Sequence, residues 1–296
     1  MSISPFTMNL VRFTPIGCLA LVAVCLAGPP IPADSKLSGD RIDVDINGNI
    51  YILNTEKNSV TLLTKDRVPL REIGGAGWEN NQFDRPSGIW ARNGIDVFVA
   101  DYGNHRIQRF DRNLSYVSTL YTREDPDPDQ RFGYPADVAV SRLGFLFICD
   151  TENSRIAKIN QLSQVERTFG GFSAGEGRLY SPSKVECGPA DRVYVVDGPR
   201  LMVYDNFGNF LHALAGVFHP PLSLYASDTR VVVVDSSTVY CFNGEERAVC
   251  TVPAETVFGV SGKEINAIAF SRDSMFAVSR EGLLVAPDPV QMMRER

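Results

Sequence analysis

A short sequence pattern recurs along most of the chain with a period of about 45 residues. Its clearest copy begins with Pro86 to Ala91, continues with the apolar run Val97 to Ala100, and ends with Asp101 to Asp111. A second copy follows about one period later, from Pro135 to Ile159. A repeat of this length indicates small structural units, each of which buries its apolar faces only by stacking against its neighbours.

The spacing of the units can be measured from the residue that ends the most apolar run of each one. Six such positions are separated by 47, 49, 47, 38 and 44 residues: Asn54, Asp101, Asp150, Asp197, Asp235 and Ser279. Each follows a run of four apolar residues, largely β-branched or aromatic, such as Val231 to Val234. Runs of this kind are typical of strands that are buried on both faces.

Other short strands flank each apolar run, and turn residues such as Asn93-Gly94 separate them. One strand precedes the run, and two follow it in most units, so each unit predicts a small antiparallel sheet. Six sheets in succession, without helical periodicity, predict an all-β protein: a six-bladed β-propeller of four-stranded antiparallel blades. The last unit ends near Ala286 one strand short, and we expect residues near Ser35 to Ser38 to supply that strand.

Residues 1–27 predict a cleaved export signal. The apolar run Ile16 to Ala27 has 12 residues, too few to cross about 30 Å of hydrocarbon. Small residues precede Gly28, as cleavage requires. Lipid attachment at Cys25 is the alternative, although Val24 is unusual before a lipidated cysteine. The remaining predicted segments are a proline-rich linker at 28–36, the propeller at 37–286 and a C-terminal tail at 287–296.

Charge and export narrow the classes of partner. The net charge is −6, so the chain is a poor candidate for binding nucleic acid, whose affinity for proteins comes mainly from phosphate contacts. The predicted signal makes the protein secreted or, in a bacterium, periplasmic. We therefore expect the partner to be an envelope or extracellular protein, or a carbohydrate.

Export also permits disulfide bonds, and four cysteines follow the signal: Cys149, Cys187, Cys241 and Cys250. Cys241 and Cys250 flank a predicted hairpin. If its turn lies between Glu245 and Glu246, the two cysteines are directly opposite each other, and this arrangement predicts a cross-strand disulfide. None of the cysteine spacings is typical of a zinc site.

Two copies of the repeat share a longer motif. Phe83 to Pro86 is followed by Asp101 to Ile107, and Phe132 to Pro135 is followed by Asp150 to Ile156. This motif resembles the unit of the NHL-repeat proteins, with its Phe-x-x-Pro step and its Asp-x-x-Asn-His-Arg-Ile segment. The resemblance covers roughly Leu37 to Ala286 and implies the propeller fold of a secreted or envelope NHL-repeat protein. It implies little about activity, because NHL relatives include binding modules, RNA-binding domains, sensor ectodomains and a few enzymes.

Three copies of the repeat also place an Asp at the end of one strand and an Arg at the start of the next. The pairs are Asp101 with Arg106, Asp150 with Arg155, and Asp197 with Arg200. One interpretation is that each pair stabilises its own hairpin by satisfying turn amides. The other is that these arginines ring one face of the propeller together with His105 and bind a ligand. The second interpretation makes these seven residues the candidate ligand-binding site.

The central channel offers an alternative function, a metal-dependent hydrolase or lyase. Asp137, Lys184 and Glu186 lie on predicted first strands, which line the channel of a propeller. Propeller lactonases hold a divalent ion there with carboxylates, but Lys184 would oppose a cation. The lyase relative that releases amidated peptides depends on metal-bound histidines, and this chain has three histidines at unrelated spacings: His105, His212 and His219. We predict no catalytic residue, no metal site and no cofactor.

The favoured function is therefore an exported, non-catalytic module that binds a protein or another ligand. A propeller is a rigid frame with exposed loops on two faces, where recognition usually takes place. Tyr121 to Gln130 is the longest insertion between strands and a candidate contact loop, although its aspartates also suit a solvated surface.

Overall fold

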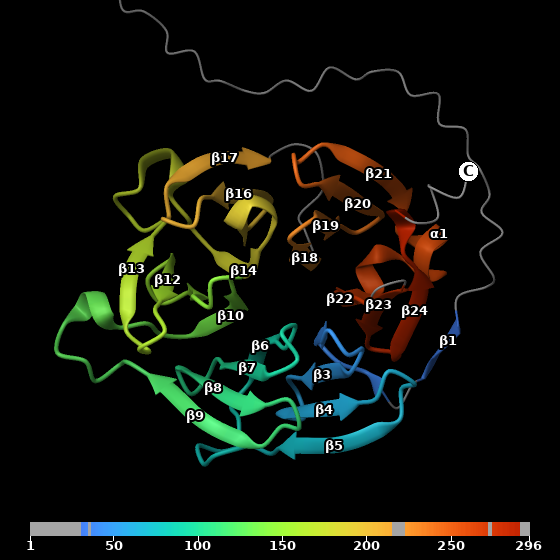
Figure 1. Ribbon diagram of the computed structural model, residues 1–296, viewed down its shortest axis with the longest axis horizontal. Coiled ribbons are helices and arrows are strands. Elements are labelled where there is room, and N and C mark those ends of the chain that lie inside the picture. The colour runs from blue at the N-terminus through green and yellow to red at the C-terminus, as the bar shows by residue number, and fades with distance from the viewer. Residues whose placement is uncertain (1–30, 35–36, 215–222, 272–273, 291–296) are drawn as a thin grey trace, which may run out of the picture.

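The protein, described here by a computed structural model, forms a ring of six β-sheets around a central axis (Figure 1). The structure describes residues 31–34, 37–214, 223–271 and 274–290. The predicted export signal at 1–27, with Cys25, lies outside the described residues, as does His219. Every blade is a four-stranded antiparallel sheet, so the predicted fold class is confirmed.

The first three blades are each formed by four consecutive strands. Blade 1 contains β2 (Arg41–Val44), β3 (Ile50–Asn54), β4 (Ser59–Leu63) and β5 (Pro69–Gly74). Blade 2 contains β6 (Pro86–Trp90), β7 (Asp96–Asp101), β8 (Arg106–Asp111) and β9 (Tyr116–Tyr121). Blade 3 contains β10 (Pro135–Val140), β11 (Leu146–Asp150), β12 (Arg155–Ile159) and β13 (Val165–Phe169).

The remaining blades complete the ring. Blade 4 contains β14 (Pro182–Cys187), β15 (Val193–Asp197), β16 (Arg200–Tyr204) and β17 (Phe210–Leu214). Blade 5 contains β18 (Ser223–Ser227), β19 (Arg230–Val234), β20 (Thr238–Asn243) and β21 (Ala248–Pro253). Blade 6 contains β22 (Ile265–Phe270), β23 (Ser274–Ser279), β24 (Leu283–Pro287) and β1 (Ile31–Asp34). A short α-helix, α1 (Ala254–Phe258), lies between blades 5 and 6.

The second strand of each blade forms the core, as its apolar run predicted. In β15, Val193 and Val195 pack with blade 3, while Tyr194 and Val196 pack with blade 5. Successive side chains of a strand point to opposite faces, so a continuous apolar run serves both neighbouring blades at once. The core of the molecule therefore lies between blades, and no blade is stable alone.

Blade 6 closes the ring with a strand from the other end of the chain. β1 pairs antiparallel with β24, with Ile31 opposite Val285 and Asp34 opposite Leu283. Closure by an N-terminal strand was predicted, but near Ser35 to Ser38; the strand lies further back and within the range assigned to a linker. It includes Pro32, which an outermost strand tolerates because one side of it makes no ladder hydrogen bonds.

Side-chain contacts also join the first and last blades. Ile42 of β2 and Val278 of β23 belong to one buried cluster, which spans the seam between blades 1 and 6. Asp288 lies in the predicted C-terminal tail, yet it is buried and forms an ion pair with Arg230 of β19. The propeller therefore extends beyond both predicted boundaries. No helix among the described residues is long and apolar enough to span a membrane.

Removal of β1 tests the closure. Deletion of residues 1–36 exposes the edge of β24, so we expect the free energy of unfolding to fall by about 1–3 kcal/mol, the net worth of a few hydrogen bonds. The melting temperature should fall by roughly 3–8 °C. Deletion of residues 1–30, which retains β1, is the matched control in the same calorimetric measurement. Equal melting temperatures for the two truncations would contradict a closing role for β1.

Candidate functional site

The alternation of strand directions gives the propeller two distinct faces. The turns between first and second strands meet at one end of the axis, and we call this end the first-hairpin face. The turns between second and third strands lie at the other end, together with the segments that link the blades. We call this end the connector face. The predicted ligand-binding residues all belong to turns of the connector face.

Asp101 and Arg106 join the hairpin of blade 2 to the segment that precedes this blade. Arg106 donates from Nε to Asp101 Oδ2 at 2.7 Å, from Nη1 to the Trp78 carbonyl at 2.6 Å, and from Nη2 to the Gln82 carbonyl at 3.0 Å. The other carboxylate oxygen of Asp101 accepts the amide of Asp84 at 2.8 Å. The Arg106 side chain is only 3% exposed, so its charge faces protein groups and not solvent.

The same arrangement recurs in the next two blades. In blade 3, Asp150 binds Arg155 Nε at 2.9 Å and the Gly133 amide at 3.0 Å. In blade 4, Asp197 forms an ion pair with Arg200 and accepts the amides of Tyr180 and Ser181. Arg155 and Arg200 also donate to connector carbonyls, those of Arg131 and Arg178. Each pair thus ties a hairpin to its connector, which is the stabilising interpretation of the motif.

His105 has a local role of the same kind. Its Nδ1 accepts hydrogen bonds from Arg123 at 2.8 Å and from the Tyr134 amide at 3.1 Å, and its ring lies against Tyr134. Burial and the neighbouring Arg123 lower the pKa of His105, which keeps the ring neutral and able to accept. The seven predicted residues therefore form hydrogen bonds and ion pairs within the propeller. That they also bind an external ligand stays a prediction.

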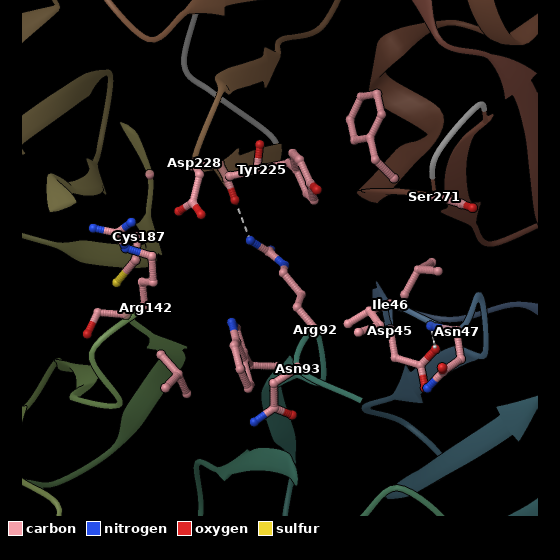
Figure 2. A pocket seen from close by; sticks show the side chains of 18 of the residues that line it. Asp45, Ile46, Asn47, Arg92, Asn93, Arg142, Cys187, Tyr225, Asp228 and Ser271 are labelled. Carbon is pink, nitrogen blue, oxygen red and sulfur yellow. Dashed lines mark hydrogen bonds between the residues drawn. The ribbon is translucent and has the colours of Figure 1, made fainter. Parts of the chain in front are cut away.

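A large open cavity lies on the axis at the first-hairpin face, where the sequence analysis placed no candidate residue of its own. Its volume is about 1100 Å³. All six blades contribute turn residues to it, and ten lining residues are labelled in Figure 2. The turn residues include Asn47, Asn93, Arg142, Gly188, Asp228 and Ser271. This volume is slightly above the usual range for ligand sites, about 300–1,000 Å³.

Arg92 reaches across the floor of this cavity from blade 2 (Figure 2). Its Nε binds Asp43 of blade 1 at 3.0 Å, and its Nη2 binds Glu186 of blade 4 at 2.5 Å. Its Nη1 donates to the Ala226 carbonyl of blade 5, and its guanidinium lies 4.4 Å from the Tyr225 ring centroid. One side chain therefore connects four blades at the axis.

Burial dominates the electrostatics of this network. Burial alone lowers the pKa of Arg92, but Asp43 and Glu186 outweigh it and hold the pKa above its ordinary value. Burial raises the pKa of Glu186 to about 8, in spite of the opposing charge of Arg92. Oε2 of Glu186 has no hydrogen-bond partner in the structure. The floor thus holds a fixed cation and a carboxyl group that retains a proton near neutral pH.

Further along the channel lie the other charged residues that the sequence placed on first strands. Burial, with the nearby Arg41, lowers the pKa of Lys184 to about 7, and Asp137 opposes this change. Asp137 accepts the Val185 amide at 3.1 Å and packs against Gly88 of β6. A Cβ atom at Gly88 would lie 2.4 Å from Asp137 Oδ1, so only glycine fits there. The channel thus holds cations among its carboxylates.

Neither Arg92 nor its ion pair with Asp43 was predicted from the sequence. Arg92 lies in a turn outside the repeat motif, and Asp43 resembles part of a polar turn that ends with Asn47-Gly48. One signal was available, because charged residues on or just after otherwise apolar first strands must face the channel. Their pairing could not be predicted, because it joins residues 49 and 94 positions apart.

The two cysteines predicted to form a disulfide do lie opposite each other, on β20 and β21. Both thiols are free in the structure and share a hydrogen bond, which raises the pKa of Cys241 and lowers that of Cys250. The register is confirmed, and the disulfide stays a prediction. In the part of the chain that the structure describes, no three His, Cys, Asp or Glu side chains gather as a metal site.

The sequence matches known proteins in ways that agree with this fold. Residues 132–159 match the family model of the NHL repeat. This segment covers blade 3 from its connector to its third strand, including the Asp150–Arg155 pair. The chain therefore contains an NHL repeat within a six-bladed propeller.

Three curated relatives show partial similarity. The chain is 32% identical over 145 residues to Protein brain tumor of Drosophila melanogaster, which covers 48% of this chain and 13% of that protein. It is 30% identical over 117 residues to the probable peptidyl-alpha-hydroxyglycine alpha-amidating lyase pgal-1 of Caenorhabditis elegans, covering 38% and 31%. It is 26% identical over 191 residues to human NHL repeat-containing protein 3, covering 58% and 53%. The matches span about half or less of each relative.

Solved structures share the architecture at low identity. A streptogramin B lyase structure superposes with a TM-score of 0.61 and 12% identity, over 87% of this chain and 95% of that one. Virginiamycin B lyase from Staphylococcus aureus gives a TM-score of 0.58 and 13% identity, over 83% and 78%. At such identities the likeness shows the fold alone.

The Asp–Arg pairs can be tested by stability. Arg106→Ala removes the cation paired with the buried Asp101 carboxylate and the Arg106 donors to the Trp78 and Glu79 carbonyls, so the free energy of unfolding should fall by about 3–5 kcal/mol. Arg85→Ala, which removes a solvent-exposed pair with Asp84 nearby, is the control and should cost less than about 1 kcal/mol. Urea denaturation measures both changes. Wild-type stability for Arg106→Ala would favour the ligand-binding interpretation instead.

The raised pKa of Glu186 predicts a pH dependence of stability. From about pH 4.5 to about pH 8 the folded protein keeps the Glu186 proton that the unfolded chain has lost, so the contribution of Glu186 falls as pH rises through this window. The unfolding free energy of the wild type, measured relative to that of Glu186→Gln, should therefore decrease by up to about 1.4 kcal/mol for each unit by which the pH rises. Denaturation at several pH values measures it, and a flat difference would contradict the shift.

Proposed function

We propose that this chain is an exported propeller that binds a partner protein at the first-hairpin face and has no catalytic activity of its own. The observation that carries the proposal is the axial cavity, which is open at this face and lined by turns from all six blades. A cavity surrounded by turns of a rigid ring suits the insertion of a loop or side chain from a partner. Export, by the predicted signal at 1–27, would make that partner an envelope or extracellular protein.

Exposed apolar side chains near the cavity support a protein partner. Ile46, Ile95 and Leu143 lie in the corresponding turns of blades 1, 2 and 3, and they are 66%, 66% and 51% exposed. The turns of blades 1 and 2 lie close together, since a Cβ added at Gly94 would lie 2.9 Å from Asn47 Nδ2 and 3.8 Å from Ile46. Exposed apolar side chains in the turns around a cavity are typical of protein interaction sites.

A lyase acting in the channel is the second candidate, and the similarity to the Caenorhabditis elegans lyase favours it. The described histidines do not favour it. His105 lies in a hairpin of the connector face, and His212 lies on β17, the outermost strand of blade 4. Neither lines the axial cavity, where a channel enzyme would hold its substrate.

Photo-crosslinking tests the proposed face. Benzoylphenylalanine at Ile95 or Leu143, introduced into the full-length protein in its source cells, should crosslink to one defined protein that mass spectrometry identifies. The same probe at Phe172 or Tyr180, exposed apolar positions of the connector face, is the matched control and should not. Crosslinks from the connector face alone would contradict the proposal. One stoichiometric metal ion in the purified protein, found by elemental analysis, would favour the lyase.

A further inference from the structure

The first strands of the six blades bring one residue each to the same level of the axial channel. These strands lie nearest the axis, and each pairs with the apolar second strand of its own blade (Figure 1). Lys184 is opposite Val196 in this pairing, and Arg41 is opposite the equivalent residue of blade 1, Leu53. We call the six residues at this level the channel ring, in blade order Arg41, Gly88, Asp137, Lys184, Ser223 and Ala267.

Arg41 and Lys184 enter the channel from opposite sides. Asp43 and Glu186, two residues further along the same two strands, both bind Arg92 on the axis. Side chains two residues apart in a strand share a face, so Arg41 and Lys184 face the channel as well. Blades 1 and 4 are three positions apart in a ring of six, which places the two cations across the axis from each other.

Neither cation is paired with an acid. Lys184 is only 8% exposed, and it forms no ion pair or hydrogen bond with the residues that the structure describes. Arg41 donates from Nη1 to the Asp40 carbonyl, but its buried Nε has no hydrogen-bond partner. Asp137, the acid of the channel ring, accepts the Val185 amide instead. Buried polar groups are almost always satisfied, so unpaired donors of this kind indicate a bound water molecule or ion.

The charge of the channel favours an anion over water. With Lys184 protonated, the channel ring holds two bases and one acid. At the next level Asp43 balances Arg92, while Glu186 keeps its proton near neutral pH. One positive charge is therefore left over. A water molecule satisfies donors but leaves this charge in place, and an unpaired buried cation is costly.

The rest of the channel ring provides space and a third donor. Gly88 and Ala267, on either side of Arg41, have no side chain long enough to reach the axis. Ser223, next to Lys184, is 1% exposed, and its Oγ accepts the Ile268 amide at 3.1 Å. A hydroxyl group can accept and donate at once, and this one donates to no described residue. Three blades thus offer donors to one small ligand.

We propose that the channel ring binds a small inorganic anion of the size of chloride, held between Arg41 and Lys184. The inference goes beyond the proposed function, since it concerns the interior of the channel and not the face that meets a partner. The anion neutralises the unbalanced charge and joins blades 1 and 4 across the axis. It therefore stabilises the closed ring at a second level, beside the contacts of Arg92.

Binding of the anion is coupled to the charge of Lys184. Burial and the nearby Arg41 lower the pKa of Lys184 to about 7, whereas Asp137, Glu186 and Cys149 act in the opposite direction. An anion favours the protonated amine, so it raises this pKa when it binds. Above about pH 7 Lys184 must first gain a proton, and the affinity for the anion therefore falls by up to about tenfold per pH unit.

Thermal unfolding in two salts tests the inference. Two charge-assisted hydrogen bonds correspond to a dissociation constant of about 1 mM. At about pH 6 the purified protein should therefore melt about 4–8 °C higher in about 100 mM sodium chloride than in sodium gluconate of equal ionic strength. Gluconate is too large for the channel ring and screens surface charges equally. At about pH 9 the difference should shrink to about 1 °C.

Variants identify the groups that hold the anion. Lys184→Met removes the ammonium group and keeps an unbranched side chain, so the melting temperatures in the two salts should agree within about 1 °C. Ser223→Ala removes a neutral donor and should weaken chloride binding by about two- to tenfold. Lys263→Met, at an exposed lysine of the connector face, is the matched control and should keep the full difference between the salts.

Bromide, which replaces chloride and scatters anomalously, locates the ion directly. Crystals grown in sodium bromide at about pH 6 should show an anomalous peak on the axis between Arg41 and Lys184. Absence of a peak there would overturn the inference, even if Lys184→Met failed to fold. Equal chloride effects in wild type and Lys184→Met would also overturn it. Both results are independent of crosslinking from Ile95 and Leu143, which tests the proposed function.

Discussion

Burial of both faces of every blade is the constraint on which this structure depends. A four-stranded sheet such as β14 to β17 has apolar side chains on each side, and Val195 and Tyr194 serve different neighbours. The free energy of burial, about 25 cal/mol per Å² of apolar surface, is gained only when each blade has a blade on both sides. The cluster that contains Ile42 and Val278 and the pairing of β1 with β24 therefore stabilise the closed ring, because open terminal blades would leave apolar faces in water.

Two sets of buried ion pairs hold the ring in register, and they act in different places. Asp101, Asp150 and Asp197 fix each connector to the hairpin beside it, so they set the spacing between consecutive blades. Arg92 instead connects blades across the axis and forms the floor of the cavity. Both sets are costly to desolvate and costly to break, so their main value is in fixing one arrangement of the blades. The cavity has a defined shape because its floor is fixed in this way.

The repeat made much of the fold predictable before the structure. The run Val193 to Val196 and its equivalents indicated the second strands, and Pro86 and Pro135 marked the beginnings of first strands. The position of Cys241 opposite Cys250 followed from hairpin geometry and is confirmed, whereas the disulfide between them stays a prediction. Two features were placed wrongly along the chain. β1 lies nearer the N-terminus than expected, and Asp288 belongs to the packed domain, since neither forms part of a repeating unit.

The sequence by itself determined the number of blades, the order of their strands and the positions of the Asp–Arg pairs. These features follow from local periodicity and from contacts between residues close in the chain. Only the tertiary structure decided what lies on the axis. Asp43, Arg92, Glu186 and Ala226 come from four different blades, and they meet because ring closure brings their first strands together. The strongest sequence motif thus marks residues that stabilise the blades, whereas the cavity is built from turns that do not repeat.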